Sequence, residues 1–230
     1  MRPFLRNTSL STIFLALFAA SLAGMAIAAH ADYNNDELSH ARLLGEQPEP
    51  LSLGRYLVSS HFWQAVMENW QSEYLQFTLF VLLTVWLLQR GSPESKELDQ
   101  PGGEPDSEQH VGRHAKPGSP RWARAGGLRL AIYENSLVIA MASIFLLSWF
   151  AHSVTGWSEY NAEQIEHEAG RLSWLQYLGS ADFWSTSLQN WQSEFLAVGS
   201  MAVLSIYLRQ RGSPESKPVG EPHGSTGVSG

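Results

Sequence analysis

The sequence predicts an all-α membrane protein, with four transmembrane helices from two parallel tandem repeats and amphipathic helices at the outer interface. Two observations predict this fold: the apolar residues are gathered into four long runs, and the second half of the chain repeats the first. The average composition, with 16% charged residues and a net charge of -7, hides this separation. An acidic balance argues against binding to nucleic acid. The lack of cysteine excludes disulfides, thiolate metal sites and cysteine nucleophiles.

The apolar runs differ in length. The first run, 10–29, and the third, 132–154, are long enough to cross a hydrocarbon core of about 30 Å, although residues 134–135 interrupt the start of the third. The second run, 74–88, and the fourth, 195–208, have only 15 and 14 residues. Either the bilayer thins around them, or each helix takes in the polar residues before it. The predicted spans are therefore about 10–29, 70–89, 132–154 and 191–209.

The basic residues predict the orientation. Twelve of the 15 lie before the first span, between the second and third spans, or after the fourth. By the positive-inside rule, both termini and the loop 91–131 are predicted to be cytoplasmic. One alternative remains, because Arg2, Arg6 and the first apolar run, followed by Ala26-Ile27-Ala28 or Ala29-His30-Ala31, are also typical of a cleavable signal peptide. Cleavage would leave three spans.

The duplication is a direct sequence match. Residues 51–96 align with 172–217 without a gap, at an offset of 121, and the alignment closes on eight identical residues, 89–96 and 210–217. Further upstream the offset is 127, which places an insertion of six residues near 45–50. Because each copy contains two spans, both copies enter the membrane in the same direction and are related by a pseudo-two-fold axis along the membrane normal.

This alignment defines four regions. The first repeat is 1–96 and the second is 132–217, and the shared first span favours a first helix that is retained. The linker 97–131 and the tail 218–230 are rich in Gly, Pro, Ser and Glu, so both are predicted to be disordered, the linker on the cytoplasmic side.

The repeated block Asn-Trp-Gln-Ser-Glu supplies the strongest functional candidates. In helices of full membrane length, Glu73 and Glu194 would lie at equal depth in the outer hydrocarbon layer, where a carboxylate must face the bundle or water. These two glutamates would share a proton or hold a cation, or they would cap and anchor the helices as hydrated residues. The predicted polar cluster consists of Asn69, Gln71, Ser72, Glu73, Asn190, Gln192, Ser193 and Glu194.

Two further patterns lie outside the membrane core. Asn34 and Asn161 occupy expected helix N-caps, and each is followed by an acid–histidine pair four residues apart. We predict no metal or other cofactor, and interpret these pairs as surface residues, with a metal cage shared between the copies as the alternative. The weak candidate ligands are Asp36, His40, Glu163 and His167. Tryptophans seven residues apart suit interfacial anchors, with a ligand-stacking platform as the alternative; they are Trp63, Trp70, Trp184 and Trp191.

At the duplicated Asn-Trp-Gln-Ser-Glu and Arg-Gly-Ser-Pro-Glu-Ser-Lys blocks, the chain resembles a family of bacterial integral membrane proteins known only as a domain of unknown function. The likeness covers about 4–96 and 132–217. It implies the duplicated architecture and a place in the bacterial plasma (inner) membrane, and it implies no activity.

We therefore expect a multi-pass membrane protein that acts as a structural or interaction module. Its expected partners are the lipid bilayer and a second copy or another membrane protein. The alternative is a small ion- or proton-handling transporter or channel that uses the paired glutamates at the outer face. The sequence contains no phosphate-binding loop, nucleophile elbow or other catalytic motif, so we predict that the protein is not an enzyme.

Overall fold

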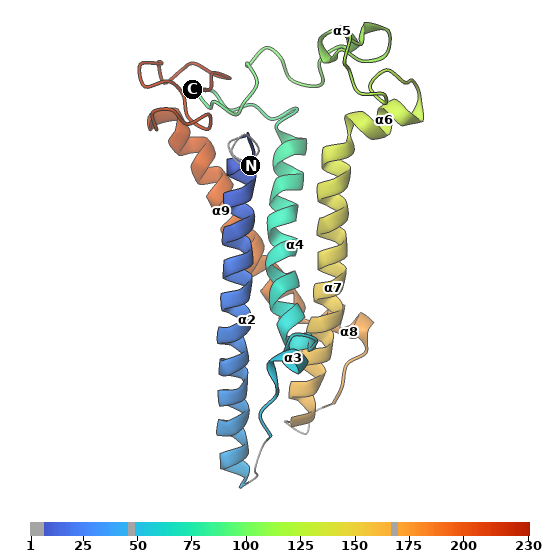
Figure 1. Cartoon of the computed structure of the whole chain (residues 1–230), viewed down its shortest axis with the longest axis vertical. Helices are drawn as coiled ribbons and strands as arrows, with labels where there is room; N and C mark the ends of the chain where they lie inside the picture. Colours follow the sequence, from blue (N-terminus) through green and yellow to red (C-terminus); the bar gives the residue numbers. More distant parts are fainter. Residues whose placement is uncertain (1–6, 46–48, 167–169) are drawn as a thin grey trace. The chain divides into compact units, whose positions relative to one another are not determined.

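The computed structural model describes residues 7–45, 49–166 and 170–230. Within these residues all regular secondary structure is helical, as the sequence predicts (Figure 1). Two of the described helices, Ser9–Leu43 and Ser136–Ile165, are long and apolar enough to cross a membrane, rather than the four that the sequence predicts. The second predicted span falls on a helix that ends early, at Leu83. The helix over the fourth begins with residues 181–194, a mixture of polar and aromatic side chains that dilutes its apolar run.

The chain divides into two compact units. One comprises residues 1–66 and 154–171, and the other comprises 67–153 and 172–230. Helix α4 (Ser60–Leu83) and helix α7 (Ser136–Glu166) contribute to both units.

In the first unit, α2 (Ser9–Leu44) runs without a break through Asn34, so the predicted helix start at this residue is wrong. The Asn34 amide binds the chain that returns after α2. Its Oδ1 accepts the Leu51 N–H at 2.7 Å and its Nδ2 donates to the Leu51 carbonyl at 3.0 Å. Asn161 likewise lies inside α7, so the N-cap prediction is wrong there as well.

Tyr56 forms the centre of the first unit, at the end of the short helix α3 (Leu53–Tyr56). Its side chain is fully buried, and its ring lies 5.6 to 5.9 Å from the rings of His30, Tyr33, His61 and Phe62. Its hydroxyl lies 3.2 Å from His61 Nδ1. Three segments of the unit therefore meet on one aromatic residue.

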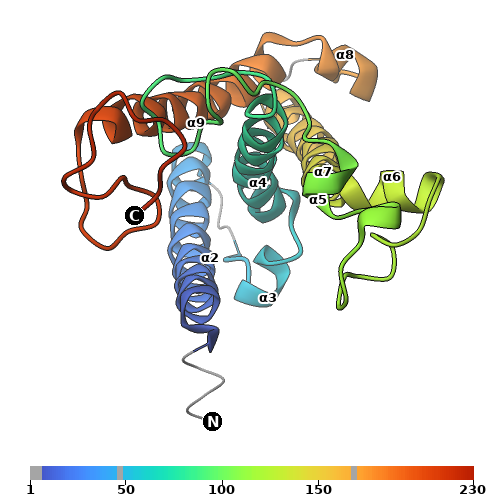
Figure 2. The ribbon, with the colours of Figure 1, turned by 90° about the horizontal axis from the view of Figure 1, so that it is seen from above.

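In the second unit, α6 (Leu128–Glu134) stops at Asn135 and α7 begins at Ser136, so the predicted span 132–154 is divided between two helices at the polar residues near its start. Helix α8 (Trp174–Leu178) starts with a capping box between Ser173 and Gln176, and leads directly into α9 (Ala181–Tyr207) (Figure 2). Segments 56–73 and 177–194 were expected to form interfacial helices before the chain turns or runs into the next span, and residues 60–73 and 181–194 belong to these segments. They are instead the first turns of α4 and α9.

The segments expected to be flexible contain turns and short helices in the structure. The linker carries α5 (Asp106–Gln109) and a 3-10 turn (Gly112–His114), and the tail is a series of turns. Both segments return to the residues that precede them through hydrogen bonds from lysine side chains, described below.

Candidate functional site: polar contacts between α4 and α9

The two Asn-Trp-Gln-Ser-Glu blocks lie on α4 and α9, and side chains from the two helices bind each other within the second unit. The indole Nε1 of Trp191 donates to Gln71 Oε1 at 2.6 Å. Gln71 is fully buried, and its Nε2 donates to the Glu68 carbonyl one turn earlier on α4. Gln71 is therefore held both by its own helix and by α9.

Asn190 makes the second contact. Its Nδ2 donates to the Glu68 carboxylate at 2.7 Å and to the Thr186 carbonyl at 3.0 Å. Sequence reasoning missed Glu68, since it precedes the repeated block and its counterpart in the second copy is Gln189.

The remaining predicted residues do not all join this contact. The hydroxyls of Ser72 and Ser193 donate to backbone carbonyls three residues earlier on their own helices. Glu73 interacts electrostatically with its counterpart Glu194. Gln192 is exposed, whereas its counterpart Gln71 is buried, and Asn69 is exposed as well. Identical blocks thus occupy unequal surroundings.

The four predicted anchor tryptophans differ in their surroundings. Trp191 packs against α7, with its ring 5.9 Å from Trp149 and 6.5 Å from Phe145. Because the same indole reaches Gln71, Trp191 connects α4, α7 and α9. Trp63 and Trp184 are 42% and 40% exposed, which is compatible with the predicted anchoring role. Trp70 packs edge-on against Tyr74 on its own helix.

A cavity of about 380 Å³ lies between α4 and α9. Every residue on its wall is matched by the residue 121 positions away; the pairs are Gln76 with Ala197, Phe77 with Val198, Phe80 with Met201, and Glu94 with Glu215. Burial, together with the neighbouring Glu215 carboxyl, raises the pKa of Glu94. Sequence reasoning noted the blocks that contain these glutamates, but it did not predict that the two carboxyls would meet.

The two identical eight-residue blocks fold into the same turn. In each, the first backbone N–H donates at 2.9 Å to the serine six residues later, Gln89 to Ser95 and Gln210 to Ser216. The glycine of each block is left-handed, with φ of 85° at Gly91 and 81° at Gly212. Such values favour glycine, because a side chain is strained there.

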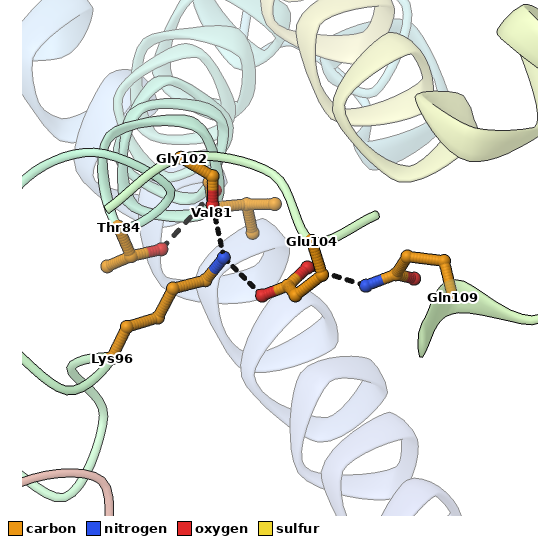
Figure 3. A network of polar contacts seen from close by, with 6 residues as sticks. All are labelled: Val81, Thr84, Lys96, Gly102, Glu104 and Gln109. Carbon is orange, nitrogen blue, oxygen red and sulfur yellow. Dashed lines mark hydrogen bonds and ion pairs between the residues drawn. The ribbon is translucent and has the colours of Figure 1, made fainter. Parts of the chain in front are cut away.

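The lysine that ends each block holds the chain that follows. Lys96 Nζ donates to the Gly102 carbonyl at 2.6 Å and pairs with Glu104, which in turn accepts from Gln109 (Figure 3). Lys217 Nζ donates to three tail carbonyls, including that of His223 at 2.8 Å. In both cases the lysine reaches the carbonyl six residues ahead.

The weak metal candidates belong to the first unit. Asp36 and Glu163 line one cavity of about 210 Å³, together with further carboxylates and His61, which sequence reasoning missed. His40 is not among its lining residues, and His167 lies outside the described residues. Within the described part of the chain, no group of three or more His, Cys, Asp or Glu is arranged to hold a metal ion. Burial and the nearby carboxylates of Glu159 and Asp32 raise the pKa of Tyr56 beside this cavity.

Of the comparisons with known proteins, the one with family models gives a match. No curated protein and no solved structure matches the chain. A family model covers nearly its whole length, residues 1–228. The chain therefore belongs to the family described as a domain of unknown function, DUF6766.

Proposed function

We propose that the chain is a multi-pass membrane protein of the bacterial plasma membrane, with two parallel copies of a two-helix unit and both termini in the cytoplasm. Helices α2 and α7 supply two apolar spans. Helices α4 and α9 have 24 and 27 residues, or about 36 and 40 Å at 1.5 Å per residue, which is enough to cross. They reach this length by including the polar turns before their short apolar runs, as one of the two sequence interpretations requires.

Labelling of single cysteines tests this topology without background, because the natural chain contains no cysteine. In intact cells, a membrane-impermeant maleimide should label Leu175→Cys, on the exposed face of α8. It should label Ser107→Cys in the linker only after the membrane is opened. Labelling of Ser107→Cys in intact cells, or recovery of the chain in the soluble fraction, would overturn the proposal.

Within the membrane we propose a structural or interaction role. The observation that carries it is the pair of bonds from Trp191 to Gln71 and from Asn190 to Glu68. Buried polar groups that bind each other hold helices together, and in this arrangement their donors are directed at protein rather than at a ligand. The expected partner is a second copy of the chain or another membrane protein.

The second candidate is ion or proton handling. It is favoured by two pairs of carboxylates. Glu73 and Glu194 lie on α4 and α9, and Glu94 and Glu215 line the cavity between these helices. Paired carboxylates in a region of low dielectric share protons or hold cations. Few polar side chains would line such a path, since Gln76 is the one polar residue on the cavity apart from the glutamates.

Flux through proteoliposomes distinguishes the two roles. For a structural module, proton and potassium flux should equal that of empty liposomes, both for the natural chain and for the variant Glu73→Gln with Glu194→Gln. A flux in the natural chain that this variant abolishes would support ion handling and reject the structural role. The variant Glu94→Gln with Glu215→Gln then tests whether the cavity lies on the same path.

A further inference from the structure

The second unit contains an aromatic cavity of about 280 Å³ that the polar contacts leave unused. It lies among α7, α8 and the start of α9. Its wall includes Trp149, Phe150, Ser153, Trp174, Phe183 and Trp184. Several of the rings brace one another, with Trp149 stacked on Phe183 at 5.9 Å and Phe150 edge-on to Trp174 at the same distance.

The polar atoms of this wall already have partners. The Ser153 hydroxyl donates to the Phe150 carbonyl at 2.7 Å and accepts from Trp174 Nε1 at 3.2 Å. Trp184 Nε1 donates to the Leu178 carbonyl at 3.0 Å, and Trp149 Nε1 donates to the Ser187 hydroxyl at 3.4 Å. A ligand of this cavity would therefore meet carbon surface, which suits a molecule without polar groups.

The cavity adjoins the apolar surface of α7. Leu146 and Phe150, both on its wall, are 57% exposed, and Leu147 beside them is 69% exposed. In the proposed membrane this part of α7 lies near the outer end of its span. The volume equals that of roughly nine liquid waters at about 30 Å³ each, so the cavity fits part of a hydrocarbon chain rather than a whole lipid.

The two sequence copies differ at these positions. Trp149 and Phe150 align with Leu22 and Ala23, and Trp174 aligns with Leu53. Phe183 and Trp184, in contrast, align with identical residues. Three of the five aromatic residues on the wall are thus particular to the second copy, and the first copy supplies matched control positions.

We propose that this cavity binds one hydrocarbon chain of a lipid from the outer leaflet. The inference rests on the proposed membrane location. It assigns the cavity a single occupant, an acyl chain inserted between α7 and α8. Apolar cavities of this kind take up apolar guests rather than water, so an acyl chain is the guest that this wall favours.

Photolabelling of the full chain in nanodiscs tests the proposal. The probe is a phosphatidylethanolamine with a photoreactive diazirine near the end of one acyl chain, and labelled peptides are quantified by mass spectrometry. Peptides of α8 and early α9 should be labelled in the natural chain. Leu146→Trp, which fills the cavity mouth from an exposed position, should reduce this labelling at least threefold. Ala19→Trp, at the aligned position of α2, should leave it unchanged.

A second variant guards against misfolding. Trp174→Leu introduces the residue of the first copy and removes one wall, so it should also lower labelling of α8. The exposed residues Leu10 and Phe14 of α2 serve as an internal standard for lipid contact. If α2 is labelled but Leu146→Trp changes nothing on α8, the lipid site is rejected and the membrane proposal stands. If neither α2 nor α7 is labelled, the membrane proposal itself fails.

Discussion

The bond between Trp191 and Gln71 should contribute measurably to the stability of the second unit. Trp191→Phe removes the indole N–H and keeps a ring against α7, while Gln71→Leu removes the amide at similar size. A hydrogen bond contributes about 0.5 to 1.5 kcal/mol net in water, and between membrane helices about 0.6 on average with a maximum near 1.7. Because Gln71 is fully buried and the bond measures 2.6 Å, we expect a coupling of about 1 kcal/mol, in the middle of the first range and above the average of the second.

The single variants should not be equal. Trp191→Phe leaves the fully buried Gln71 amide without its donor from α9, which costs about 1 to 3 kcal/mol. Gln71→Leu leaves the indole N–H of Trp191 without its acceptor, and it costs less because Trp191 is only partly buried. The assay is reversible unfolding in mixed micelles, followed by circular dichroism, for both single variants and the double variant. Gln192→Leu is the matched control, because this exposed counterpart should change stability by no more than about 0.5 kcal/mol. A coupling below about 0.3 kcal/mol, the value for independent sites, would refute the reasoning.

Three further predictions concern other sites. The raised pKa of Glu94 means that the folded state binds this proton more tightly than the unfolded chain does, so stability should fall as pH rises above the ordinary value of 4.5, and Glu94→Gln should abolish this slope in pH-dependent unfolding. Gly91→Ala should destabilise by at least about 1 kcal/mol more than Gly212→Ala in thermal melts, because an added Cβ would collide with a carbonyl oxygen of the tail only at the first glycine. Asn34→Leu should release the backbone of Leu51 and accelerate its amide hydrogen exchange at least tenfold.

Each of these has a contrary result. An unchanged pH slope in Glu94→Gln would mean that its carboxyl is hydrated and separate from Glu215. Equal losses for the two glycine variants would mean that the tail does not pack on the first block. Unaltered exchange at Leu51 would remove the proposed reason why α2 continues through Asn34.

The helical class could be predicted from the sequence, because it depends on local apolar runs, whereas the division of the third apolar run at Asn135 was not predicted. The helix boundary at Asn34 could not be predicted either. An asparagine followed by glutamate three residues later is typical of an N-cap, yet here the amide is engaged by the backbone of Leu51, 17 residues away. Local patterns carry no information about such a distant partner.

The candidate site shows the same division. The repeated block and its paired glutamates were identifiable by comparing the two halves, and the proximity of Glu73 to Glu194 followed from symmetry. The role of Glu68 did not follow, because it has no acidic counterpart. The unequal burial of Gln71 and Gln192 also lies beyond a symmetry argument, since identical sequences predict identical surroundings. The two copies differ in the structure because Trp191 donates to Gln71, whereas its counterpart Trp70 packs against Tyr74 on its own helix.

The lysine that ends the first block has a consequence for how the two halves can be joined. Lys96 fastens the chain at Gly102 and Glu104, so the first residues of the connection after α4 follow a path that the first copy itself fixes. The length and composition of the linker between Gln109 and Gly127 are then free to vary. A foreign domain inserted there would move independently of the turn that Lys96 holds. The second block ends in the same kind of fastening at Lys217. Each copy of the repeat is thereby followed by a turn that its own lysine holds in place.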